Sequence, residues 1–177
     1  MPSLEVALQE GIRAVAFHHT ELSLLPDALA LFGRRARVGV WGMVAPEAVR
    51  DAAAAGAHFV TSPVSGADLA DAAGDTPFLP GGLTPSELVA APGEEVQVVP
   101  ADAMPMAYGR SLRSLLGGRA FIATGRLERF QLELWYDAGA SAIGLSGDAL
   151  LGPSAGDLGE LRDRCRSFVE AVRKATG

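Results

Sequence analysis

Seven short apolar runs, separated by segments of helical patterning, constrain the fold of this chain more than any other feature of its sequence. The runs recur roughly every 20–25 residues, which is the spacing of repeated strand–helix units. They are apolar on both faces, as parallel strands buried on both sides are. The predicted strands are Arg13–His19, Arg37–Met43, Ala57–Ser62, Thr76–Gly81, Val96–Ala101, Ala120–Thr124 and Ser141–Leu145.

The segments between these runs predict helices. Pro46 suits a first helical position, where its missing N–H costs nothing. Glycines such as Gly56 and Gly139 follow the predicted helices, where a left-handed residue commonly ends a helix. In the last segment, an apolar stripe with a period near 3.6 predicts an amphipathic helix. The predicted helices are Ser3–Glu10, Pro46–Ala55, Ser86–Ala90, Tyr108–Leu116, Glu128–Ala138 and Asp157–Thr176.

Alternating strands and helices fit either a (β/α) barrel or an open doubly wound sheet. A dinucleotide-binding sheet carries a G-x-G-x-x-G turn after its first strand, and this sequence has none. We therefore predict an α/β fold of the TIM-type (β/α) barrel. The 177 residues fit a single domain, 1–177, in which 157–176 form the C-terminal amphipathic helix.

The composition excludes several classes of protein. The net charge of −6 argues against a surface for nucleic acid or for an anionic membrane. No apolar run approaches the ~18–20 residues that span a bilayer, and the N-terminus lacks a signal-peptide pattern. The single cysteine, Cys165, excludes an internal disulfide and a cysteine-cluster metal site. We expect a cytoplasmic protein without a cofactor or a bound metal.

The basic residues also restrict the chemistry. Of the 15 basic residues, 14 are arginine, and the single lysine is Lys174, close to the C-terminus. Arginine stays charged at ordinary pH, whereas lysine can become a neutral nucleophile. A mechanism that needs a buried lysine is therefore close to excluded.

The strand ends carry a series of short motifs. In chain order they are Ala55-Gly56-Ala57-His58-Phe59 with Ser62-Pro63, then Pro80-Gly81-Gly82-Leu83-Thr84-Pro85-Ser86-Glu87, Pro100-Ala101, and Thr124-Gly125. This series resembles the 2-keto-3-deoxy-6-phosphogluconate (KDPG) and 4-hydroxy-2-oxoglutarate aldolases, from about Leu4 to about Leu151. The resemblance implies a (β/α)8 barrel, commonly trimeric, that cleaves or forms 2-keto acid aldols through a Schiff base on a strand lysine.

The positions that this resemblance assigns to catalysis hold other residues. Gln97 stands where the family has its Schiff-base lysine, and Ala16 where it has its acid/base glutamate. A carboxamide cannot form an imine, and a methyl group cannot transfer a proton. The resemblance therefore implies a scaffold that has lost class I aldolase chemistry. The family begins with an apolar strand before its first helix, whereas this sequence begins within that helix, at about Ser3–Glu10. Seven strands are therefore readable, and three explanations stay open: a partner covers the gap, the barrel closes with seven strands, or the start is truncated.

Three side chains are candidates for a different chemistry. Active sites of these barrels lie at the carboxyl ends of the strands, where His18, Glu21 and Asp102 fall. Alternation along the strand places His18 on the face of Ala16. His18 then acts as a general base with Asp102 or Glu21, or it is a histidine satisfied by a neighbouring backbone group.

The loops after the last two strands are where such barrels hold a phosphate. The ligand candidates there are Thr124, Gly125, Arg126, Gly144 and Ser146. Backbone N–H groups and the Thr124 hydroxyl suit an oxyanion, and Arg126 adds a forked charge. Asp148 opposes an anion, and an ordinary exposed Arg126–Asp148 pair is the alternative interpretation.

A second group of residues is expected to line or fill the pocket. Trp41 is expected to fill volume that the family leaves for substrate, and Gln97 to act as a hydrogen-bonding plug. Thr84 and Glu87 have the spacing of a helix capping box. The pocket candidates are Trp41, Gly42, Ser62, Pro63, Gly81, Gly82 and Gln97.

Three functions stay open at this stage. The first is an aldolase-like barrel that binds a small 2-keto acid or phosphorylated metabolite without class I cleavage. The second is a lyase or other enzyme that uses His18. The third is a structural subunit with a filled barrel. Family resemblance adds the expectation of a homo-oligomer, a trimer.

Overall fold

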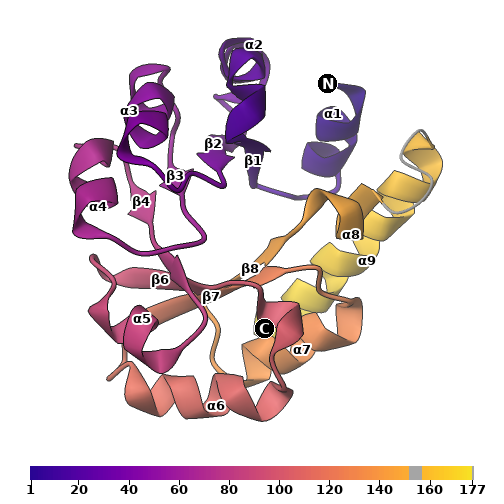
Figure 1. Cartoon of the computed structure of the whole chain (residues 1–177). Coiled ribbons are helices and arrows are strands. Elements are labelled where there is room, and N and C mark those ends of the chain that lie inside the picture. The colour runs from indigo at the N-terminus through magenta and orange to yellow at the C-terminus, as the bar shows by residue number, and fades with distance from the viewer. Residues whose placement is uncertain (152–156, 177) are drawn as a thin grey trace. The chain divides into compact units, whose positions relative to one another are not determined.

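The computed structural model describes residues 1–151 and 157–176, and these residues divide into two compact units (Figure 1). Unit 1 consists of Met1–Ile12 and Val98–Gly177, and unit 2 of Arg13–Gln97. The prediction of a single domain over 1–177 stays a prediction.

Unit 2 contains a parallel sheet with the strand order β1-β2-β3-β4. Helices α2, α3 and α4 lie along the same side of this sheet (Figure 1). The elements are β1 (Ala14–His18), the 3-10 helix η1 (His19–Leu24), α2 (Leu25–Phe32), β2 (Arg37–Trp41), α3 (Pro46–Ala54), β3 (Val60–Thr61), α4 (Ala67–Ala73) and β4 (Phe78–Leu79).

The rest of unit 2 begins where Pro80 interrupts the predicted strand Thr76–Gly81. After Pro80 the chain forms a separate short strand, β5, which is a neighbour of β6. The N–H of Gln97 donates to the carbonyl of Pro80 at 2.8 Å. Proline has no N–H for a ladder, which explains the break. The elements are β5 (Gly81–Gly82), α5 (Pro85–Ala90) and β6 (Glu95–Val98).

The capping box predicted at Thr84 and Glu87 is present. The N–H of Glu87 donates to Thr84 Oγ1 at 3.3 Å, and Glu87 Oε2 accepts from the N–H groups of Thr84 and Leu83 at 2.8 and 2.9 Å. These backbone hydrogen bonds hold the pKa of Glu87 below its usual value. The motif therefore starts α5 and contributes no catalytic group.

Unit 1 contains the parallel pair β7–β8, with helices at its sides (Figure 1). Its core joins α7, β8 and α9 through the buried Leu132, Phe168 and Ala171. The elements are α1 (Pro2–Gln9), the 3-10 helix η2 (Ala101–Ala103), α6 (Met106–Leu115), β7 (Ala120–Gly125), α7 (Arg129–Asp137), β8 (Ala142–Leu145), α8 (Gly147–Leu151) and α9 (Leu158–Thr176).

All seven predicted strands and the six predicted helices are present, with shifted ends. Gly56 and Gly139 have φ values of 86° and 101°, as predicted for residues that end helices. Along α9, Leu161, Cys165 and Phe168 are buried, whereas Leu158 is 41% exposed. The apolar stripe therefore predicts the buried face of α9 except at its first turn.

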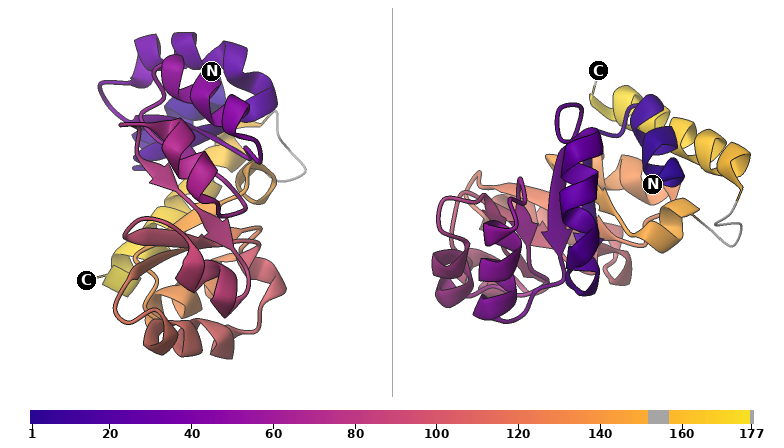
Figure 2. Two further views of the ribbon diagram at one scale, coloured as in Figure 1. Left: turned by 60° about the vertical axis from the view of Figure 1, so that its left-hand side comes forward. Right: turned by 90° about the horizontal axis from the view of Figure 1, so that it is seen from above.

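Helix α1 lies against α9 in unit 1, and the two helices are seen side by side in Figures 1 and 2. Val6 and Ala7 pack with Leu161 and Cys165 in one buried cluster. Burial and the charge of Glu10 raise the pKa of the Cys165 thiol to about 11. Cys165 is therefore a neutral core residue at ordinary pH.

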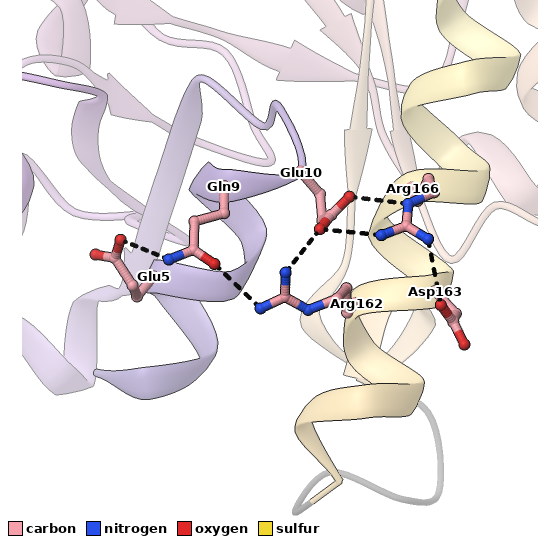
Figure 3. Close-up of polar contacts among 6 residues, drawn as sticks. All are labelled: Glu5, Gln9, Glu10, Arg162, Asp163 and Arg166. Carbon is pink, nitrogen blue, oxygen red and sulfur yellow. Dashed lines mark hydrogen bonds and ion pairs between the residues drawn. The ribbon is translucent and has the colours of Figure 1, made fainter.

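A charged cluster borders this apolar contact (Figure 3). Glu10 follows α1, and its carboxylate accepts from Arg162 Nη1 and from Arg166 Nε, both at 3.1 Å. The side chain of Glu10 is only 12% exposed. Hydrogen bonding to Glu10, and then its charge, raises the pKa of Arg166. We call Glu10, Arg162 and Arg166 the Glu10 clamp.

Candidate functional site

Gln97, which the sequence resemblance places at the family's lysine position, has a buried and hydrogen-bonded side chain. It is 3% exposed, near the end of β6. Its Nε2 donates to Ser62 O at 2.7 Å and to Thr61 Oγ1 at 2.9 Å. Both contacts tie β6 to the end of β3. The side chain therefore has the geometry of a hydrogen-bonding plug between two strand ends.

Ala16, which the sequence resemblance places at the family's glutamate position, is exposed in the middle of β1. Its parallel partner in β2 is Gly39, so neither strand offers a proton-transfer group at this level. A Cβ on Gly39 would come within 2.6 Å of the Phe59 ring, which explains why this position needs a glycine.

His18 ends β1 with its imidazole held in one orientation. Nδ1 lies 2.7 Å from Thr20 Oγ1 and accepts from the N–H of Thr20 at 3.4 Å. The ring meets Trp41 edge to face, with centroids 4.8 Å apart. One of the two interpretations of His18 was a histidine satisfied by neighbouring groups, and this holds for Nδ1. The Nε2 atom takes no part in these contacts.

Trp41 does not fill an interior, contrary to the sequence-based expectation. It is 46% exposed, whereas Met43 is fully buried. Alternation along β2 fixes which residues share a face, but Trp41 is the last residue of the strand. Its indole turns toward His18, which is its register partner in β1.

The predicted partners of His18 are not brought to it within unit 2. Glu21 is exposed in η1, and no contact joins its carboxylate to His18 among the described residues. Asp102 belongs to unit 1. The pairing of His18 with either acid stays a prediction.

In unit 1, Asp102 braces the turn after β7. Its Oδ1 accepts from the N–H of Arg126 at 2.8 Å. A Cβ on Gly125 would collide with the same oxygen, so the carboxylate lies directly over Gly125. Asp102 therefore uses one carboxylate oxygen to hold the backbone that presents Arg126.

The candidate anion residues lie together at the ends of β7 and β8. Thr124 and Gly144 are register partners, and a Cβ on Gly144 would come within 2.6 Å of Thr124 Oγ1. The N–H of Ser146 donates to Gly125 O at 3.0 Å. Arg126 is exposed, and its guanidinium makes no ion pair with Asp148 or another described carboxylate.

The segment after Ser146, which we expected to be a loop, forms the short helix α8 instead. Ser146 Oγ accepts from the N–H of Ala149 at 3.4 Å, and the Ser146 carbonyl accepts from the same N–H at 3.0 Å. The serine side chain starts this turn. Sequence reasoning missed α8 because it is only five residues long.

The remaining pocket candidates are packed rather than open. Ser62 is fully buried, and its Oγ accepts from the N–H of Val64 at 3.1 Å. Gly81 and Gly82 are buried, and Pro63 is half-buried. Gly42 has φ 86°, and a Cβ there would lie 2.9 Å from His18 Nε2.

His58, which the sequence places at the start of a strand, is used structurally. Its Nδ1 accepts from the N–H of Val38 at 3.1 Å, and its carbonyl accepts from Arg37 Nη2 at 3.2 Å. Among residues 1–151 and 157–176, no three His, Cys, Asp or Glu side chains form a group that could hold a metal ion. In the same part of the chain, no helix is both long and apolar enough to cross a membrane.

Two supporting residues were missed by sequence reasoning. Thr20 orients His18, and Thr61 accepts from Gln97. A threonine two residues after a histidine is a weak signal, because short polar side chains near strand ends commonly bond to local groups. The pairing of Thr61 with Gln97 spans 36 residues and has no local signal.

Parallel strands that alternate with helices, with the candidate residues at their carboxyl ends, define an α/β protein of the TIM-barrel type. The chain matches a structure of native KDPGal with 22% identity and a TM-score of 0.88, covering 98% of this chain and 88% of that one.

Other solved structures agree on the fold. KDPG aldolase from Legionella pneumophila, with pyruvate captured as a covalent carbinolamine intermediate, has 20% identity and a TM-score of 0.81, with 94% and 86% of the two chains covered. Thiamine phosphate pyrophosphorylase from Pyrococcus furiosus has 16% identity and a TM-score of 0.75, with 99% and 90% covered. No family model and no curated protein matches the sequence. The fold is that of the KDPG aldolases.

Proposed function

We propose that this chain is an aldolase-like barrel that has lost Schiff-base aldol cleavage and binds a small 2-keto acid or phosphorylated metabolite. One observation carries the proposal. Gln97, in the position of the family's lysine, donates both to Ser62 O and to Thr61 Oγ1 and has no amine with which to attack a carbonyl.

No other lysine can replace this group. The single lysine, Lys174, is exposed in the last turn of α9. The exposed Ala16 offers no proton acceptor at the position of the family's glutamate. Loss of the nucleophile together with its proton-transfer partner supports loss of the reaction itself.

The ends of β7 and β8 support the binding of an anion. Asp102 accepts a hydrogen bond from the N–H of Arg126, so this N–H is not available to a ligand. The guanidinium of Arg126 is exposed and pairs with no described carboxylate. A planar guanidinium and the Thr124 hydroxyl, from residues two apart at the end of β7, are groups that suit a carboxylate or phosphate.

The second candidate is an enzyme of altered chemistry that uses His18. The observation in its favour is the fixed imidazole, whose Nδ1 is bonded to Thr20 while Nε2 makes no hydrogen bond among the described residues. A base held in this way is typical of proton-transfer sites. A structural subunit with a filled barrel is the weakest candidate, because Trp41 is half exposed. The family resemblance further supports a cytoplasmic homo-oligomer, a trimer.

Two experiments test the proposal on the full chain. Pyruvate with borohydride traps a lysine imine as a stable adduct, and we expect none on the wild type by mass spectrometry. Lys174→Arg controls for nonspecific modification. A stoichiometric adduct on Lys174 or on the N-terminal amine contradicts the loss of Schiff-base chemistry.

Ligand binding is tested by thermal melts with phosphate, pyruvate and KDPG. A ligand at 100 times its Kd stabilises the folded state by about 2.7 kcal/mol, which gives a readable increase in Tm. We expect such an increase with at least one of the three, and its loss in Arg126→Ala. Arg110→Ala, at another exposed arginine of unit 1, is the matched control. No increase with any of them contradicts the binding function.

A further inference from the structure

The indole of Trp41 is a large apolar surface open to solvent at the end of β2. Trp41 is 46% exposed, and Val44, in the loop that follows, is 63% exposed. Met43 between them is fully buried. Ligand sites are lined mainly by apolar and aromatic side chains together with a few polar groups that fix orientation. Trp41 also lies at the carboxyl end of a parallel strand, where barrels of this type bind their ligands.

The orientation of this indole is fixed from one side by His18. The two residues are register partners, and their rings are tilted by 73° at 4.8 Å. The His18 ring is in turn fixed by Thr20 at Nδ1 and lies against Gly42, where any Cβ would come within 2.9 Å of it. The contact with the His18 ring orders the indole before a ligand arrives, which lowers the entropic cost of binding.

His19 adds a polar group next to His18, near Gly42. Its ring centroid lies 4.4 Å from that of His18, at 45°. The imidazole nitrogens of His19 make no hydrogen bond among residues 1–151 and 157–176. A half-buried imidazole without a partner can donate a hydrogen bond to an incoming carboxylate. The three residues Trp41, His18 and His19 all belong to unit 2.

We infer that Trp41, His18 and His19 form a binding site for a planar aromatic carboxylate. The ligand ring stacks on the open face of the indole, and the ligand carboxylate accepts a hydrogen bond from His19. One part of this inference rests on the proposed function: if the ligand is a 2-keto acid, the site selects a 2-keto acid that carries an aromatic ring. The aromatic site itself depends on the indole and the two imidazoles.

Four probes separate the ring from the keto acid in calorimetric titrations of the full chain. Phenylpyruvate carries both groups, benzoate only the ring, pyruvate only the keto acid, and cyclohexanecarboxylate a non-planar ring. We expect benzoate and phenylpyruvate to bind about fivefold more tightly than cyclohexanecarboxylate and pyruvate, the gain that ring–ring contact gives. Trp41→Leu removes this preference and Trp41→Phe keeps it. Leu31→Ala, at another exposed apolar side chain of unit 2, changes nothing.

Fluorescence gives a second readout, because the other tryptophan, Trp135, is fully buried. Acrylamide quenches Trp41 selectively, and bound benzoate protects it. We expect His19→Ala to lower the affinity for benzoate. Its affinity for free indole, a probe ligand without a carboxylate, should not change. Equal affinity for benzoate and cyclohexanecarboxylate, or benzoate binding unaffected by Trp41→Leu, overturns the inference.

The outcomes also separate this inference from the proposed function. Binding of benzoate without binding of either keto acid supports the aromatic site and counts against a 2-keto acid ligand. Binding of pyruvate that equals that of phenylpyruvate and persists in Trp41→Leu supports the proposed function and overturns the aromatic site.

Discussion

The side-chain nitrogen of Gln97 lies 2.7 Å from the backbone oxygen of Ser62, and this contact joins the ends of β6 and β3. Both residues are almost completely buried. A lysine at position 97 would place an ammonium group among the same acceptors. The glutamine instead satisfies two of them without a charge. The side chain of Gln97 therefore has a structural role, because it links two strand ends within the core.

Substitution of Gln97 tests this role. In Gln97→Leu, the Ser62 carbonyl and the Thr61 hydroxyl lose their donor in a buried place, and we expect a loss of about 1–3 kcal/mol in the free energy of unfolding. Glutamate has the same shape as glutamine but presents an oxygen to the Ser62 carbonyl. The free energy of unfolding should therefore fall further in Gln97→Glu than in Gln97→Leu. Urea unfolding at neutral pH measures both.

Gln9 supplies the control for these variants. It also makes two side-chain hydrogen bonds, to Glu5 and Arg162, but it is exposed. Gln9→Ala should change the free energy of unfolding by no more than about 0.5 kcal/mol. If Gln97→Leu is equally mild, the buried hydrogen bonds of Gln97 do not stabilise the fold.

The contact of Gly125 with Asp102 makes a second prediction. A methyl group on Gly125 collides with Asp102 Oδ1, so Gly125→Ala should cost about 1–3 kcal/mol. Asp102→Gly in the same chain removes the colliding atom and should recover part of the loss. A double-mutant cycle by chemical unfolding measures this coupling.

Gly147→Ala is the matched control for Gly125→Ala. A Cβ at Gly147 meets nothing within 4 Å, and Gly147 begins α8. This variant should be neutral or slightly stabilising, because alanine favours the helix. Additive effects of Gly125→Ala and Asp102→Gly would show that the carboxylate does not brace the turn.

The sequence predicted the strands and the capping box because these depend on local patterns. A strand that is apolar on both faces, and a capping box such as that of Thr84 and Glu87, can each be recognised within a few consecutive residues. The orientation of Trp41 could not be predicted in this way. At the last position of a strand the ladder no longer constrains the side chain, and the contact with His18 depends on a register 23 residues apart.

The role of Asp102 was missed for a similar reason. Sequence reasoning placed it at a strand end as a possible acid or base, because a carboxylate at that place in a barrel suits catalysis. Its bond to the N–H of Arg126 spans 24 residues. Hydrophobic periodicity shows which faces are buried, but it does not show which backbone N–H groups lack a partner within their own strand.

The Glu10 clamp makes a third prediction. Glu10→Ala removes one acceptor from two arginines of α9, so α1 should detach more readily from α9. We expect a lower midpoint of urea unfolding, and faster hydrogen exchange in α1 than elsewhere in unit 1. Because the arginines are partly exposed, the difference from wild type should shrink in 1 M salt, where the Debye length is about 3 Å.

Asp163→Asn is the control for the clamp. Asp163 also contacts Arg166, at 3.8 Å, but its side chain is 81% exposed. Such a surface pair contributes little, so this variant should unfold like the wild type. Equal effects of Glu10→Ala and Asp163→Asn would mean that the burial of Glu10 does not strengthen the clamp.

Cys165 gives a prediction about pH. Its thiol has a pKa of about 11 in the folded protein against the usual 9.0, because it is buried and lies near Glu10. Below pH 9 the thiol is protonated in both states and contributes no pH dependence. Between pH 9 and 11 the unfolded chain loses the proton first, so the stability of the folded state falls as the pH rises.

The size of this effect follows from the shift, since one pKa unit corresponds to about 1.4 kcal/mol. At pH 10 we expect the wild type to have lost about 1 kcal/mol more than Cys165→Ala, relative to each protein at pH 8. The comparison cancels Tyr136, whose pKa burial also raises. In the folded protein a thiol reagent should label Cys165 far more slowly than in urea. Equal pH dependence of the two proteins would show that the Cys165 thiol titrates alike in the folded and unfolded chain.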